Sequence, residues 1–130
     1  MTEFAIRKVL AGTYDAVLAK VPDALKTEGF GVLTEIDVKD TLKKKLDVDF
    51  RRYKILGACN PTLAHKALET EIELGVMLPC NVIVYEGNEG KTVVAAIDPM
   101  QTVAATGNPR LREIATEVRA RLTRVLGRIE

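Results

Sequence analysis

The sequence contains no serine and no tryptophan, one glutamine, one histidine (His65) and two cysteines (Cys59 and Cys80). The absence of serine excludes a Ser-His-Asp catalytic triad. A single histidine excludes the two-histidine helical zinc signature and the three-histidine catalytic zinc site, because each needs several imidazoles around one metal ion. Any chemistry of this protein has to come from a small set of reactive side chains.

The 130 residues have the length of one domain, which we place at residues 1–130. With 19 basic and 18 acidic side chains the net charge is +1, so no overall field directs the chain to nucleic acid or to an anionic membrane. Residues 1–8 contain neither a charged leader nor a long apolar run, and no stretch approaches the ~20 apolar residues of a membrane span. We therefore expect a cytoplasmic protein with reduced thiols. The scarcity of Gln, Cys and Met beside abundant Lys, Arg and Glu indicates a thermophilic source.

Hydrophobic periodicity and capping residues predict an α+β domain with the order β-α-β-α-β-α-β-β-α. Pro22 lies inside the first helical pattern and predicts a kink there or two short helices. The expected elements are a strand at 3–7, a helix at 13–29, a strand at 30–36, a short helix after Asp37, a strand at 52–59, a helix from Asn60 to about Gly75, strands at 82–85 and 92–97, and a last helix from Asn108-Pro109.

The two strands of the expected hairpin, 82–85 and 92–97, are apolar on both faces. A two-layer domain leaves one face of its sheet in water, and that face then carries polar residues. Either helices cover both faces of this sheet, or a second copy of the chain covers one.

The basic residues do not form a nucleic-acid site. The lysines at 39–45 lie on the polar face of a short helix, and the arginines of the last helix are interleaved with Glu113 and Glu117. The few aromatic residues form no recognisable RNA-binding motif. We expect no nucleic-acid partner and no membrane partner.

Two junctions gather the remaining reactive side chains, and each places a cysteine beside a bend at a strand end. Cys59 precedes a predicted helix start, where free backbone amides stabilise a thiolate, so it is the candidate nucleophile. His65 lies one turn further on and is a candidate base, and Cys80 is a candidate resolving thiol or second ligand.

The neighbours of the two cysteines are the candidate ligand-binding residues. Asn60 and Pro61 form a helix start whose amides can hold an anion. Pro79 and Asn81 flank Cys80 at the second junction. A polar notch beside an apolar sheet has the geometry of a small-molecule site.

Three interpretations of this group of residues compete. The spacing Cys59-x5-His65-x14-Cys80 matches none of the closed structural zinc patterns, so we predict no metal and no cofactor. Thiol redox or covalent chemistry is the second interpretation, and against it stand the absence of a Cys-x-x-Cys pair and the position of the one histidine on a helix, where its reach to Cys59 is not fixed by the sequence. Small cysteines packed under a capped helix, without a chemical role, are the third interpretation.

Three segments in the same order resemble a known family: Gly29–Val38, Tyr53–Pro61 and Leu78–Val82. They resemble the uncharacterised bacterial and archaeal proteins grouped as domain of unknown function family 302. The resemblance implies a two-layer α+β fold similar to that of the TATA-binding protein, with helices on a curved antiparallel sheet, and it implies a homodimer. It does not imply DNA binding, because a shared fold does not carry a function with it.

Two functional hypotheses follow. The first is a small homodimeric protein that binds a ligand or partner at a cleft near Cys59-Asn60-Pro61 and Pro79-Cys80. The alternative is a thiol-dependent enzyme or redox protein that uses Cys59, with Cys80 and His65 assisting. The residues alone leave open whether the protein is an enzyme.

Overall fold

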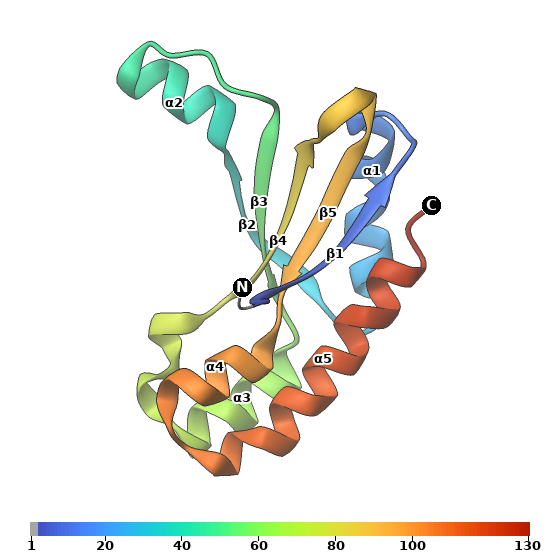
Figure 1. The fold of residues 1–130 in the computed structure, drawn as a ribbon. Helices are drawn as coiled ribbons and strands as arrows, with labels where there is room; N and C mark the ends of the chain where they lie inside the picture. Colours follow the sequence, from blue (N-terminus) through green and yellow to red (C-terminus); the bar gives the residue numbers. More distant parts are fainter. Residues whose placement is uncertain (1–2) are drawn as a thin grey trace.

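The computed structural model describes residues 3–130, in which helices pack on one five-stranded antiparallel sheet of order β1-β5-β4-β3-β2 (Figure 1). This is the predicted α+β fold; Met1 and Thr2, the first residues of the expected N-terminal segment, lie outside the described residues. The strands are β1 (Ala5–Leu10), β2 (Gly31–Asp37), β3 (Tyr53–Cys59), β4 (Cys80–Glu86) and β5 (Thr92–Ile97). The helices are α1 (Tyr14–Lys26), α2 (Val38–Leu46), α3 (Pro61–Thr70), α4 (Pro99–Thr106) and α5 (Arg112–Gly127), with 3-10 turns η1 (Ile72–Met77), η2 (Asn88–Gly90) and η3 (Pro109–Leu111).

The first two helices start at the residues that the sequence predicts, and a side chain caps each of them. The hydroxyl of Thr13 accepts a hydrogen bond from the Ala16 amide at 3.2 Å at the start of α1. The carboxylate of Asp37 does the same for the Asp40 amide at 2.9 Å at the start of α2. Each cap satisfies an amide that has no partner inside its helix.

Of the two alternatives predicted at Pro22, the division into two short helices is wrong, because α1 is one helix that continues through this residue, and the kink stays a prediction. Proline removes one backbone hydrogen bond from a helix interior. Val21 and Leu25 on either side are completely buried in the core. Their packing offsets the lost bond and keeps the two halves together.

The predicted element order lacks α4, which lies between β5 and the last helix. Asp98 caps this helix through the Met100 amide at 3.0 Å, and Pro99 occupies its first turn. Its apolar residues do not form a clear stripe at helical spacing, so the periodicity of the sequence does not reveal it. The corrected order ends β-β-α-α.

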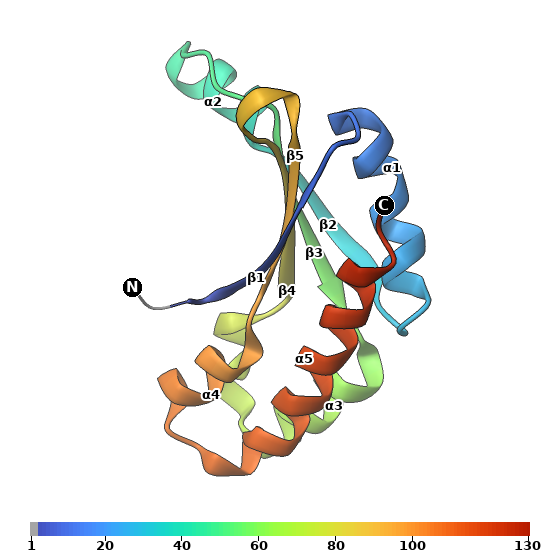
Figure 2. The same cartoon turned by 45° about the vertical axis from the view of Figure 1, so that its right-hand side comes forward.

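The helices leave one face of the sheet uncovered in the described part of the chain. Figures 1 and 2 show α1 and α5 together on one face, and α3 and α4 beyond one end of the strands. The main core fills the space between α1, α5 and the sheet, with fully buried residues such as Val17, Val82 and Leu122. A second, smaller hydrophobic cluster lies among α3, η1, α4 and α5. Within residues 3–130, no helix is both long enough and apolar enough to span a bilayer.

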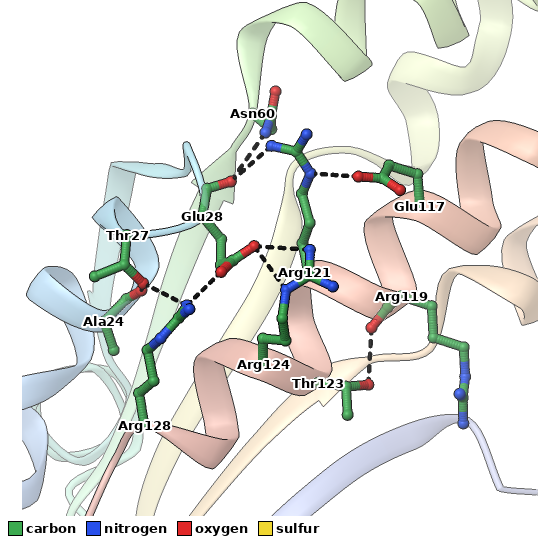
Figure 3. Close-up of polar contacts among 10 residues, drawn as sticks. All are labelled: Ala24, Thr27, Glu28, Asn60, Glu117, Arg119, Arg121, Thr123, Arg124 and Arg128. Atoms are coloured by element: carbon green, nitrogen blue, oxygen red, sulfur yellow. Dashed lines mark hydrogen bonds and ion pairs between the residues drawn. The ribbon is translucent and has the colours of Figure 1, made fainter.

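Glu28, in the turn between α1 and β2, is a charged residue with only 9% of its surface exposed. Its Oε1 accepts hydrogen bonds from Arg124 Nε at 3.0 Å and Nη2 at 2.9 Å, and its Oε2 accepts from Arg128 (Figure 3). Both arginines belong to α5 or its C-terminal cap. The carboxylate therefore fastens the end of α1 to the last helix.

The backbone carbonyl of Glu28 accepts two further hydrogen bonds, from Asn60 Nδ2 at 3.2 Å and from Arg121 Nη1 at 3.1 Å (Figure 3). Gly29 follows with φ of +83°, and a Cβ at this position would lie 3.0 Å from Asn60 Nδ2. Glycine is needed here for its positive φ and for the close approach. Glu28 thus joins the α1–β2 turn to α5 and to the start of α3.

The hydrogen bonds from Arg124 and Arg128 lower the pKa of Glu28 from 4.5 to about 2. Because the folded-state pKa lies below the unfolded value, the ionised carboxylate stabilises the fold above that unfolded value, and the contribution is lost as the pH falls towards 2. We predict that Glu28→Gln lowers the free energy of unfolding at neutral pH and flattens its decline in acid, as measured by urea denaturation at a series of pH values.

Glu113→Gln is the matched control, because Glu113 is an exposed carboxylate in the first turn of α5. In this variant the free energy of unfolding should fall in acid as steeply as it does in the wild type. An acid limb of unchanged steepness in Glu28→Gln would contradict the role given to this carboxylate.

Candidate functional site

A pocket of about 350 Å³ lies at the end of the sheet, between the strand ends and helices α3, α4 and α5. Within the described residues its wall contains no charged side chain. The wall is formed by Phe30, Leu33, Ala58, Cys59, Asn60, Leu63, Ala64, Ala67, Leu68, Leu74, Met77, Leu78, Pro79, Cys80, Ile97, Pro99, Thr102, Val103, Leu111, Ile114, Ala115 and Val118. The pocket therefore includes four of the residues that the sequence marks as candidates.

Asn60 positions the pocket wall where β3 ends and α3 begins. Its Oδ1 accepts a hydrogen bond from the Leu63 amide at 3.2 Å, and its Nδ2 donates to the carbonyl of Glu28. The residue is 6% exposed. Both ends of its side-chain amide are engaged in holding α3 against the α1–β2 turn, so Asn60 shapes the site.

The two cysteines occupy neighbouring positions on adjacent strands. Cys59 is the last residue of β3 and Cys80 the first of β4, where it pairs with Ala58. Both thiols are free, partly buried and part of the pocket wall. Burial, and to a smaller extent the negative charge of an ionised Cys59, raise the pKa of Cys80 to about 11. Cys80 is therefore a protonated thiol at neutral pH.

Pro79 lies beside the cysteines and also lines the pocket, and the Leu78–Pro79 peptide bond is cis. Its ring approaches Gly57 of β3 closely. A Cβ at Gly57 would lie 2.7 Å from Pro79 Cγ and 2.1 Å from the Thr34 hydroxyl. Glycine at this position lets the ends of β2, β3 and the β4 entry come together below the pocket.

His65 is not among the pocket residues. Its side chain is 76% exposed, and its Nε2 lies 3.3 Å from the carboxylate of Glu69, one turn further along α3. The residues of α3 that line the pocket are Leu63, Ala64, Ala67 and Leu68. Helical geometry places His65 on a different side of α3 from these four.

Pro61 and Asn81 are exposed and also lie outside the pocket wall. Pro61 is the first residue of α3. Asn81 lies on the opposite face of the sheet from Cys80 and Val82, because successive side chains of a strand alternate. The structure thus brings together Cys59, Asn60, Pro79 and Cys80 and separates the other three candidates from them.

Much of the pocket wall comes from helices that the sequence does not connect with the site. Val103, Leu111 and Ala115 belong to the second hydrophobic cluster. Such residues carry no chemical signal, because they resemble any core position. The signal that could have located one of these helices is the Asp98-Pro99 cap at the start of α4. Among residues 3–130, no group of three or more His, Cys, Asp or Glu side chains is arranged to hold a metal ion.

The family described as "Domain of unknown function DUF302" matches residues 6–129. A crystal structure of an uncharacterized conserved protein DUF302 from Bacillus stearothermophilus is similar to this chain with a TM-score of 0.92 and 32% sequence identity. The similarity covers 99% of this chain and 100% of that one. No functionally curated protein matches the sequence. The chain belongs to the DUF302 family.

Proposed function

We propose that this protein binds a small apolar molecule in the pocket at the end of the sheet, against the wall that contains Cys59, Pro79 and Cys80. The observation that carries the proposal is a cavity of about 350 Å³ with an apolar, uncharged lining. An apolar cavity of ~150 Å³ holds a molecule the size of benzene. The volume here is sufficient for a ligand about twice as large, and burial of its apolar surface supplies the affinity.

The hydrogen bonds at the start of α3 favour an apolar ligand in the pocket. The sequence alone indicates an anion at this helix start. Anion sites at helix starts depend on backbone amides without partners. The Leu63 amide donates to the side chain of Asn60, the Ala64 amide donates to its carbonyl, and Pro61 has no N–H. The Thr62 amide is left in this turn, and one amide does not make an anion site. With no cationic side chain in the described pocket wall, an anion gains little there.

Weak polar groups in the wall define the ligand further. Thr102 on α4 contributes a hydroxyl, and Cys59 and Cys80 contribute thiols. Thiols are weak hydrogen-bond donors. These groups favour a ligand with an apolar body and one uncharged polar group.

Filling part of the pocket should weaken the binding of an apolar probe. Ala64 lines the pocket from α3, and the ring of Ala64→Phe would occupy part of its volume. We predict that this variant weakens the binding of the neutral fluorescent probe N-phenyl-1-naphthylamine by about tenfold or more, as measured by fluorescence titration.

Ala104→Phe is the matched control, because Ala104 is an exposed residue of α4 outside the pocket wall. It should bind the probe as the wild type does. Equal loss in both variants, or no probe binding by the wild type, would refute the proposed function.

A second candidate function is thiol-dependent chemistry with Cys59 as the nucleophile. It is supported by the presence of both cysteines on one pocket wall, where a bound substrate would meet them. The exposed His65 is on a different side of α3 and is poorly placed to act as the base. The raised pKa of Cys80 makes this residue a poor nucleophile at neutral pH.

The pKa of Cys80 gives a direct test of its surroundings. Burial, the larger cause of the shift, persists in a Cys59→Ala variant, so Cys80 should react with iodoacetamide about 100-fold more slowly at neutral pH than an ordinary thiol. The rate should rise about tenfold per pH unit until the pH nears 11. Mass spectrometry follows the reaction, and the protein unfolded in urea serves as the reference. If the alkylation rate levelled off near the pKa of an ordinary thiol, Cys80 would not be buried in the pocket wall away from water.

We also propose that the protein is a cytoplasmic homodimer. The two free cysteines on adjacent strands suit a reducing compartment. The thermophilic source indicated by the composition stays a prediction. The dimer is supported by the sheet face opposite α1 and α5, which no described helix covers and on which Val9 of β1 is 56% exposed.

We predict a solution mass of twice the 14.3 kDa of one chain, measured by light scattering after size-exclusion chromatography. Val9→Asp places a charge in the uncovered face and should raise the dimer dissociation constant by about tenfold or more, because burying an unpaired charge is unfavourable. A wild-type protein that sediments as a monomer at all concentrations would contradict the proposed dimer.

A further inference from the structure

A projecting segment, residues 36–50, extends from the far ends of β2 and β3 and contains α2; we refer to it as the arm. Figures 1 and 2 show α2 standing away from the other helices. Not one residue of α2 is buried. A helix in a folded domain normally gains most of its stability from burying its apolar side. Within the described chain this burial is limited to Val38 and Leu42, which are only partly covered where α2 meets β2 and β3.

The arm nevertheless carries apolar side chains that are suited to burial. Val38 and Leu42 lie one turn apart on α2 and are half-buried against the strand ends. Four further apolar residues of the arm are exposed: Ile36 (47%), Leu46 (65%), Val48 (43%) and Phe50 (41%). Apolar residues gathered in this way mark a surface for a partner.

The charges of the arm are largely satisfied within it. Lys43 pairs with Asp47 at 3.0 Å and lies 3.7 Å from Asp49, and Lys44 pairs with Asp40 at 3.0 Å. The lysines are therefore balanced by neighbouring carboxylates and do not form a one-signed patch for a polyanion. The partner is selected by the apolar side chains.

The uncovered sheet face of the same chain is mostly apolar, so it suits the exposed apolar residues of the arm. Lys8 and Leu10 of β1 point towards the helices, because Lys8 Nζ donates to the Ile129 carbonyl at 2.6 Å and Leu10 is buried in the core. The alternate positions of each strand therefore line the other face. Arg7 is the one charged side chain at these positions in the described strands. Asn81 and Thr34 are polar, and the remaining positions are apolar, aromatic or small, including Val9, Ile55, Ile83 and the stacked pair Tyr53 and Tyr85.

We infer that the arm docks on the uncovered sheet face of a second copy of this chain, so that two chains exchange arms about a two-fold axis. This inference rests on the proposed homodimer and names its surfaces. One chain carries both the apolar arm and the apolar face, and a two-fold arrangement covers both in each copy at once. A second copy of the chain is thus a partner that covers both the arm and the uncovered sheet face.

The area available agrees with a stable dimer. Five strands of about six residues give a face of roughly 24 by 20 Å, and the nine residues of α2 add a strip about 14 Å long. The side chains of such a surface have more accessible area than its projection. With a helix width of ~10 Å the projected total is roughly 620 Å² per chain, at the lower end of the range that standard interfaces bury.

Leu46→Asp tests the arm, and Val48→Asp is a second variant in it. Both residues are exposed, so the single chain should fold, as far-ultraviolet circular dichroism checks. Sedimentation velocity over a concentration series of the full chain should show a dimer dissociation constant raised about tenfold or more in each variant. Ile72→Asp is the control, because Ile72 of η1 is 78% exposed but lies outside both surfaces.

The outcomes separate this inference from the proposed dimer. If Leu46→Asp and Val48→Asp associate as tightly as the wild type while Val9→Asp dissociates, the dimer stands and the arm contact is refuted. If the wild type is a monomer, both are refuted. A photo-crosslinking residue at position 46 gives the positional readout: crosslinks to strand peptides of the other copy support the inference, and crosslinks confined to its helices α1 and α5 overturn it.

Discussion

The hydrogen bonds around Glu28 are the constraint on which the pocket depends. Its carboxylate binds Arg124 and Arg128 on the last helix, and its carbonyl binds Asn60 and Arg121. Glu28 is nearly buried while both arginines are about half exposed, so removal of an arginine takes away part of the compensation of a carboxylate that has little access to water. Because α3 and α5 are two walls of the pocket, the same residue that closes α1 also sets the distance between these walls.

The pocket exists because small side chains line the helices that enclose it. Ala64 and Ala67 of α3 and Ala115 of α5 contribute to its wall, where larger residues would fill the space. The main core and the second hydrophobic cluster lie on either side and hold the helices in place. A space between two well-packed regions does not collapse readily, so it is available to a ligand.

Local signals in the sequence account for most of the fold. The pairing of Asn60 with Pro61 predicts the start of α3, and Asp37 predicts that of α2, because each cap depends only on residues within one turn. The same signal at Asp98-Pro99 begins α4, but the helix is short and its apolar residues lack a stripe. The continuity of α1 through Pro22 depends on the core around Val21 and Leu25, which local sequence does not describe.

The candidate site was predictable only in part. Cys59, Asn60, Pro79 and Cys80 are near bends that the sequence identifies, and antiparallel pairing of β3 and β4 brings them together. The bond from Asn60 to Glu28 spans 32 positions, and those from Arg124 and Arg128 to Glu28 span 96 and 100. Contacts at such separations follow from the assembled fold. His65 lies on α3, the helix that Asn60 caps, and it follows the pocket residue Ala64 directly. The helical turn of about 100° per residue places its side chain outside the pocket wall.

We propose that the pocket at the sheet end is a dry, apolar binding cavity. The most direct measurement is a crystal structure of the protein under xenon pressure, since xenon enters apolar cavities that exclude water. We predict xenon density between Ala64, Ala115 and Cys80. A pocket filled with ordered water under the same pressure, or closed by its own side chains, would contradict it.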